Sequence, residues 1–207
     1  MEQQPELAVR ERLLEAAIGL FARKGYHATS VREIVEAAGV TKPVLYYWFQ
    51  SKEGVFHALM AMAVEAHQEV LARVRAHEGT AAERILLLGE GVMELVKINA
   101  EVVRIFDAVY YGPREGAPDV DFDPLHGEFR RFLMSLVEEG VRSGEFRDGD
   151  VEAMQSALLG AFLVCDTAVA SYVSDGPGCG ACTDVVKDVR RVMNVVLAGM
   201  SSGERTK

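Results

Sequence analysis

The side chains best suited to chemistry in this sequence are cations and phenols between residues 29 and 52. Lys42 and Lys52 carry ammonium groups that can donate hydrogen bonds to phosphate oxygens, and Lys42 can also donate to guanine O6 or N7. Tyr46 and Tyr47 add two hydroxyls on rigid rings. No nucleophile–base arrangement and no metal-ligand spacing accompanies them, so the pattern favours nucleic-acid binding over catalysis.

Two short helices joined by a tight turn must position these side chains. Ser30 and Glu33 stand in the S-x-x-E spacing of a capping box, which predicts that a helix begins after Ser30. Apolar residues then recur at i, i+3, i+4 and i+7, on one face of a short helix: Val31, Ile34, Val35 and Ala38. Gly39 stands where the chain must leave that helix, and we expect it to have a positive φ.

The second helix is predicted at about Lys42–Phe49. Thr41 is its expected N-cap, and Pro43 falls in the first turn, where a missing N–H costs nothing. Its buried face is formed by Leu45, Trp48 and Phe49, which leaves the other faces to Lys42, Tyr46, Tyr47 and Gln50. A helix, a turn that contains glycine, and a helix with Lys and Tyr outside form the helix-turn-helix pattern.

The stretch from Arg10 to Ala58 resembles the DNA-binding domain of the tetracycline-repressor (TetR) family. The resemblance rests on AAIGLFARKGYHATSVREIVEAAGV followed by TKPVLYYWFQSKEGVF. It implies a DNA-binding regulator with a short recognition helix whose first residues enter the major groove. DNA contact is predicted for Thr29, Ser30, Arg32, Thr41, Lys42, Pro43, Val44, Tyr46, Tyr47 and Lys52.

Physical arguments support several of these contacts. Thr29 and Ser30 stand at a helix N-terminus, whose free amides attract phosphate, although either hydroxyl can also serve only as a cap. Pro43 and Val44 can contact a thymine methyl group. Lys52 lies in the first turn of the next helix, where a cation opposes the helix dipole and a phosphate would remove the conflict. The resemblance implies that one or both tyrosines reach the DNA backbone, and core packing is the alternative for an aromatic residue on a helix.

The overall composition is acidic, but its charge is unevenly distributed. The chain has 207 residues, 49% of them hydrophobic, and a net charge of −9. Residues 1–55 have seven Lys and Arg against seven Asp and Glu, and residues 23–52 have five against two. The acidic remainder is therefore expected to point away from phosphate, unless the split is chance. Without a long apolar run or a hydrophobic signal region, we expect a cytoplasmic protein that does not enter a membrane.

The fold is predicted to be all-α, with about nine helices. Residues 1–55 form a three-helix DNA-binding head, a fourth helix at about 51–76 links the domains, and residues 56–207 form a ligand-binding and dimerisation domain. The helix at about 151–174 is strongly apolar, and the last helix, at about 184–199, is apolar on more than one side. This pattern favours a homodimer in which they pair with their copies, and the core of a monomeric bundle is the alternative.

The resemblance also implies a pocket for an unknown small-molecule effector in the larger domain. Candidates for its wall are Phe106, Tyr110, Tyr111, Phe129, Phe132, Phe162 and Cys165, each of which can instead be plain core. The acidity of that domain favours a cationic or neutral effector. No cofactor is expected.

The remaining cysteines and the histidines offer weaker signals. Cys179 and Cys182 form a lone C-x-x-C in a Gly-rich loop, which can be an accident of the surface, a redox pair or part of a zinc site that lacks further ligands nearby in sequence. His57, His67 and His77 are ten residues apart, or about 15 Å along a helix, too far for one metal ion. No metal site is predicted.

The sequence therefore predicts a transcriptional repressor rather than an enzyme. It is expected to bind an inverted repeat of double-stranded DNA as a homodimer and to be released by its effector. The alternative is a helical small-molecule carrier or sensor without DNA binding, which would lack the steep salt dependence of specific operator binding.

Overall fold

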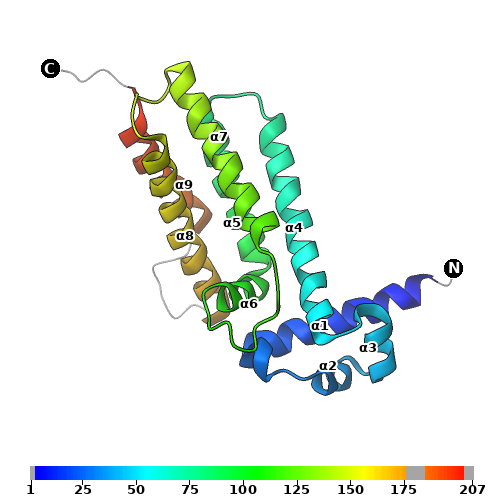
Figure 1. Ribbon diagram of the computed structural model, residues 1–207. Coiled ribbons are helices and arrows are strands. Elements are labelled where there is room, and N and C mark those ends of the chain that lie inside the picture. Colours follow the sequence, from blue (N-terminus) through cyan, green and yellow to red (C-terminus); the bar gives the residue numbers. More distant parts are fainter. Residues whose placement is uncertain (1–2, 176–184, 203–207) are drawn as a thin grey trace. The chain divides into compact units, whose positions relative to one another are not determined.

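The computed structural model describes the backbone of residues 3–175 and 185–202, and the side chains of residues 8–166 and 189–202. Within these ranges the chain forms nine α-helices and one five-residue π-helical turn (Figure 1). No strand forms there beyond an isolated bridge between Phe146 and Ser201. The predicted all-α fold, with a helix-turn-helix head and a larger helical bundle, is confirmed.

The chain divides into two compact units. The head unit comprises Met1–Val64 and Glu101–Asp121, and the bundle unit comprises Glu65–Ala100 and Phe122–Lys207. The head unit extends further than the sequence-based boundary at residue 55, because it includes residues 56–64 and a segment far away in the sequence, Glu101–Asp121.

The head unit is built from α1 (Gln3–Ala28), α2 (Val31–Ala38), α3 (Lys42–Phe49), the first half of α4 (Lys52–Ala76) and nearly all of α6 (Ala100–Tyr110). Gly25 interrupts α1 with φ 82° and ψ 162°, so α1 consists of two helical segments on either side of a kink. The apolar faces of these helices meet in a core that includes Leu13, Ala17, Phe21, Ile34, Leu45, Phe49, Val55 and Phe56.

Aromatic rings bring α6 into the head unit. The Phe56 ring of α4 lies 5.4 Å, centroid to centroid, from the Tyr26 ring and 5.4 Å from the Phe106 ring of α6. Phe21 of α1 packs at 5.3 Å from Tyr26. Since Phe56 and Phe106 are both buried, this aromatic cluster removes a large apolar area from water.

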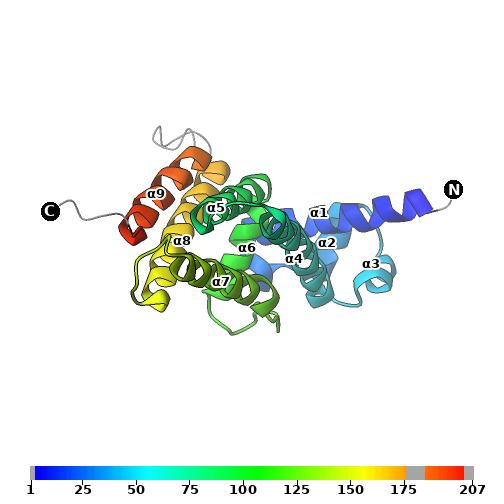
Figure 2. The ribbon, with the colours of Figure 1, turned by 90° about the horizontal axis from the view of Figure 1, so that it is seen from above.

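The bundle unit contains the second half of α4, α5 (Ala81–Ile98), a π-helical turn (Asp123–Gly127), α7 (Glu128–Ser143), α8 (Val151–Asp175) and α9 (Val185–Met200). Helix α5 packs against α7, α8 and α9, and α8 packs against α7 and α9 (Figure 2). A second capping box joins Thr80 to Glu83 at the start of α5, as its S/T-x-x-E spacing predicts. No helix in the described part of the chain is long and apolar enough to cross a membrane.

Candidate nucleic-acid interface

Helix α2 begins at a complete capping box. The Ser30 hydroxyl accepts a hydrogen bond from the Glu33 amide at 3.3 Å, and the Ser30 amide donates one to Glu33 Oε2 at 2.9 Å. Glu33 also forms an ion pair with Lys24. The hydrogen bond from Lys24, followed by those from Ser30, lowers the pKa of Glu33 to about 2. Because the folded-state pKa is depressed, the stabilisation from this carboxylate is present above its usual pKa and is lost as the pH falls towards 2.

Replacing Ser30 with alanine is expected to destabilise the head unit by about 1 kcal/mol, the usual cost of losing an N-cap hydroxyl. The Glu33 amide then loses its acceptor at the start of α2. Thermal unfolding at neutral pH measures the loss, and Ser30→Asp, which restores an acceptor, should recover most of it. An unchanged melting temperature in Ser30→Ala would contradict the capping role.

The turn between α2 and α3 has the predicted left-handed residue. Gly39 has φ 65° and ψ 38°, and its N–H points back to the carbonyls of Glu36 and Val35. Val40 N donates to Val35 O at 2.9 Å, which closes the end of α2. Helix α3 then begins after Thr41, whose side chain makes no capping bond, and Pro43 occupies its first turn.

Helix α3 presents its two tyrosines to solvent. Tyr46 is 48% exposed and Tyr47 is 74% exposed, whereas Leu45 and Phe49 are buried. Trp48, which the sequence places in the core, is only half-buried, and its ring packs edge-on against Tyr47 at 5.3 Å. Leu45 and Phe49 by themselves fill the inward face of this two-turn helix, so the indole remains at its margin.

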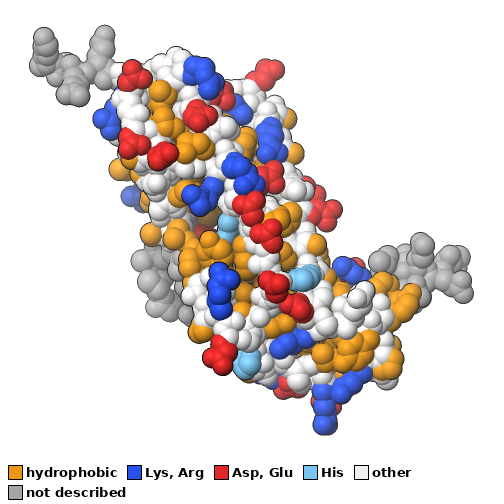
Figure 3. Space-filling view, in the orientation of Figure 1, with side chains coloured by type: hydrophobic (Ala, Val, Ile, Leu, Met, Phe, Trp, Pro, Cys, Tyr) orange, Lys and Arg blue, Asp and Glu red, His pale blue; other side chains and the backbone are white. Residues whose placement is uncertain are grey.

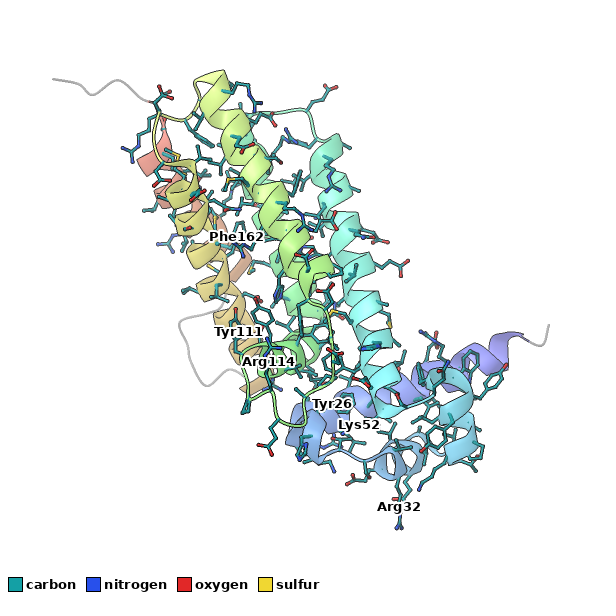
Figure 4. All side chains as sticks on the ribbon, viewed as in Figure 1. Tyr26, Arg32, Lys52, Tyr111, Arg114 and Phe162 are labelled. Atoms are coloured by element: carbon teal, nitrogen blue, oxygen red, sulfur yellow. The ribbon has the colours of Figure 1, made fainter. Side chains whose placement is uncertain are left out.

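The exposed surface of the head unit carries most of the predicted contact residues. Ser30, Arg32, Thr41, Lys42 and Pro43 are exposed, and Val44 is half-buried. Arg32 extends away from α2 (Figure 4). In the same orientation, Figure 3 shows cationic side chains beside an apolar patch on this part of the head unit. Arg32 Nε donates to Glu36 Oε1 at 2.6 Å, so this cation is shared with a neighbouring carboxylate.

Thr29 is a correction to the sequence prediction. Its side chain is 2% exposed, and its hydroxyl donates to Gly25 O at 2.8 Å. Its amide donates to Tyr26 O, and its carbonyl accepts from Lys52. The hydroxyl therefore closes the end of α1 and is not presented to DNA, while Ser30 alone caps α2.

Lys52 has partners that the sequence does not reveal. Its Nζ donates to the carbonyls of Tyr26 and Thr29, both at 2.9 Å, and lies 4.1 Å from the centre of the Tyr26 ring (Figure 4). Burial, followed by repulsion from Lys24, lowers the pKa of Lys52. The conflict between this cation and the dipole of α4 is thus relieved by carbonyl oxygens of the head itself, and a phosphate is not needed for that purpose.

The predicted ligand-pocket residues fall in both units. Phe106, Tyr110 and Tyr111 belong to the head unit, and Phe129, Phe132, Phe162 and Cys165 belong to the bundle unit. Phe106, Phe132, Phe162 and Cys165 are buried, while Tyr110 and Tyr111 are 47% and 61% exposed. A surface hollow of about 390 Å³ opens between α1 and α2, and its lining includes none of these residues.

Two further features concern metals and thiols. Cys179 and Cys182 lie outside the described residues. Within the described part, no three His, Cys, Asp or Glu side chains gather into a group that could hold a metal ion.

Comparison with known proteins identifies the family. The profile described as "Bacterial regulatory proteins, tetR family" matches residues 13–59, which include α2, α3 and the turn between them. An uncharacterised HTH-type transcriptional regulator of Bacillus subtilis, YdgC, is 33% identical over 156 residues, which cover 73% of this chain and 75% of YdgC. The chain belongs to the tetR family. It is therefore a DNA-binding transcriptional regulator and not an enzyme.

Two other matches of this tetR-family regulator span nearly its whole length. The HTH-type transcriptional repressor KstR2 of Rhodococcus jostii is 28% identical over 198 residues, covering 93% of this chain and 91% of that repressor. The crystal structure of the regulator FadR from Bacillus subtilis in complex with stearoyl-CoA aligns with a TM-score of 0.68 at 22% identity, over 92% of this chain and 98% of FadR. At that identity the structural match establishes the fold alone.

Proposed function

We propose that this tetR-family regulator is a repressor that binds an inverted-repeat operator as a homodimer. The observation that supports this most directly is the exposed face of α3, where Lys42, Tyr46 and Tyr47 stand on a helix whose other side is buried. The proposed contacts are Pro43 and Val44 to base edges, and the remaining residues to phosphate: Ser30, Arg32, Thr41, Lys42, Tyr46 and Tyr47. Residues 1–55 supply these contacts, and residues 56–207 supply dimerisation and effector binding.

Selection from a random pool of duplex DNA tests this function. The purified protein should enrich sequences with two inverted half-sites, because a two-fold symmetric dimer presents two copies of α3. Binding to the enriched duplex should weaken steeply with salt, as phosphate contacts release counterions. Enrichment of no sequence, or of single half-sites bound by monomers, would overturn the proposal.

The proposed dimer interface lies on α8 and α9. Apolar side chains on these two adjacent helices are exposed in the single chain: Leu163, Val164, Val192 and Val195. Val164 is 70% exposed and Val195 is 75% exposed. A second copy of the chain would remove this surface from water, which is the usual basis of stable homodimers.

Replacing Val164 and Val195 with aspartate is expected to convert the dimer to monomer at micromolar concentration, because carboxylates would be buried against their copies. Sedimentation velocity measures the change. Ile98→Asp is the matched control, since Ile98 is equally exposed, at 78%, but lies at the end of α5. A dimer that persists in the double variant, or dissociates equally in the control, would place the interface elsewhere.

We propose an effector site in the bundle unit beside the rings of Phe129, Phe162 and His67. The Phe129 ring packs edge-on against Phe162 at 5.3 Å and against the imidazole of His67 at 5.6 Å. Burial, followed by repulsion from His126, lowers the pKa of His67 to about 4, so this side chain is neutral at physiological pH. Its buried Nε2 makes no hydrogen bond in the described structure. Apolar walls with one neutral polar atom suit an apolar effector that carries a hydrogen-bonding group.

A further inference from the structure

The loop that follows α6 is fastened to the start of α4. This loop, residues 112–121, is here called the strap. The Asp119 amide donates to Glu53 Oε1 at 2.7 Å, and the Asp119 carbonyl lies 3.0 Å from His57 Nε2, which must donate because a carbonyl can only accept. Glu53 and His57 are four residues apart and share one face of α4. Both backbone groups of a single strap residue are therefore held by α4.

The strap also touches the last turn of α1, which follows the kink at Gly25 and leads through Thr29 into α2. Gly116 has φ 73°, and a Cβ at this position would lie 2.0 Å from His27 Nδ1. Atoms at that separation cannot coexist, so a side chain at position 116 would force the exposed His27 ring to move. Any other residue at position 116 would meet both backbone strain and the imidazole.

The turn that the strap contacts leads directly into the proposed DNA-contacting start of α2. Residues 26–29 are held by the ammonium of Lys52, which binds the carbonyls of Tyr26 and Thr29. The next residue, Ser30, is the N-cap of α2. Lys52, Glu53 and His57 all lie in the first two turns of α4. One short stretch of α4 thus holds both the strap and the turn that sets the position of α2.

We infer that the strap is a positioning element that keeps α2 and α3 in the arrangement that reads DNA, and that it acts through Glu53, His57 and Gly116. None of these three is among the proposed DNA contacts. The strap follows α6, whose Phe106 packs on Phe56 of the same stretch of α4. This inference rests on the proposed DNA-contact surface.

The sign of the effect distinguishes positioning from simple electrostatics. Removing the carboxylate of Glu53 removes a negative charge from the head, which through charge alone would strengthen binding to DNA. Loss of positioning predicts the opposite. Glu53→Ala and His57→Ala are each expected to weaken binding to the selected operator about tenfold, with the salt dependence unchanged because no phosphate contact is lost. Glu53→Gln keeps an oxygen acceptor for the Asp119 amide and should bind nearly as tightly as the unmodified protein.

Two glycine variants supply a matched control. Gly116→Ala is expected to weaken operator binding about tenfold, through backbone strain and the clash with His27. Gly144→Ala imposes the same kind of strain at φ 78°, but nothing lies within 4 Å of its Cβ, and it should leave binding unchanged. Replacing His27 with alanine in the Gly116→Ala background removes the clash and should restore part of the affinity.

The experiment is fluorescence anisotropy of full-length variants with the duplex selected by the unmodified protein, alongside thermal unfolding and hydrogen exchange of residues 26–32. Weaker binding, faster exchange in that segment and a preserved dimer are expected for Glu53→Ala, His57→Ala and Gly116→Ala. Equal or tighter binding by folded Glu53→Ala, or equal losses in Gly116→Ala and Gly144→Ala, would overturn the inference. If the unmodified protein selects no duplex, the proposed function itself fails.

Discussion

Replacing Tyr46 and Tyr47 together with alanine is expected to weaken operator binding about 100-fold without destabilising the protein. Each phenol that donates to a phosphate contributes roughly 1.5 kcal/mol, so two correspond to about two powers of ten. The folded state should lose little, because both side chains are largely exposed and the buried side of α3 is formed by Leu45 and Phe49. Anisotropy titration measures affinity, and thermal unfolding confirms the unchanged fold.

The chain offers a closely matched control for this prediction. Tyr110 and Tyr111 are also adjacent and similarly exposed, and they lie at the end of α6 in the same unit. Replacing them with alanine makes the same chemical change away from the proposed interface, and should leave operator affinity within about twofold. Equal losses of operator affinity for the two tyrosine pairs, or no loss for the pair in α3, would contradict the proposed DNA contacts of Tyr46 and Tyr47. Phenylalanine at positions 46 and 47 would separate the hydroxyl contribution from that of the rings.

Replacing Lys52 with methionine is expected to weaken both the head and its binding to DNA. Methionine keeps much of the apolar stem but leaves the carbonyls of Tyr26 and Thr29 without their charged donor. Hydrogen bonds to charged groups contribute about 1.5–3 kcal/mol net, so a loss of about 2 kcal/mol of stability is expected for this half-buried group. The turn before Ser30 should then become mobile, and operator affinity should fall about tenfold.

The salt dependence of binding identifies the role of Lys52. Each phosphate contact makes the slope of log affinity against log salt more negative by about 0.9. Lys52→Met should leave that slope unchanged while lowering the melting temperature. Lys42→Met is the complementary control, because Lys42 is exposed on α3 and its loss should reduce the slope without affecting stability. A reduced slope and an unchanged melting temperature for Lys52→Met would instead support the phosphate contact that the sequence predicts for Lys52.

Predictions from sequence succeeded where a few neighbouring residues decide the structure. The Ser30–Glu33 capping box, the positive φ of Gly39 and the bounds of α3 all follow from interactions within one or two helical turns. Hydrophobic periodicity located the fourth helix and the last two helices for the same reason, since the side chains of one face recur at a fixed interval. The same local pattern carried the family resemblance, which the comparisons confirm.

Predictions failed or were missing where the partner lies far away in the sequence. The sequence predicts that Thr29 contacts DNA, but its side chain is buried and its carbonyl accepts a hydrogen bond from Lys52, 23 residues later. The sequence correctly indicated that the charge of Lys52 conflicts with the dipole of α4, but it did not show that the carbonyls of Tyr26 and Thr29 relieve this conflict. Residue types do not indicate where backbone carbonyls will lie. No local signal connects Asp119 to Glu53 across 66 residues.

The chain's own residue types therefore established a helix-turn-helix regulator, because helix starts, turns and apolar faces are short-range properties. The tertiary structure determined which groups the cations and carboxylates bind. It also placed α6 in the head unit and brought the strap into contact with α4. Those outcomes depend on which backbone groups meet after distant helices pack, and hydrogen bonds to main-chain atoms are available to almost any sequence. For this reason the reading helices could be found from the sequence, while the contacts that hold them in position could not.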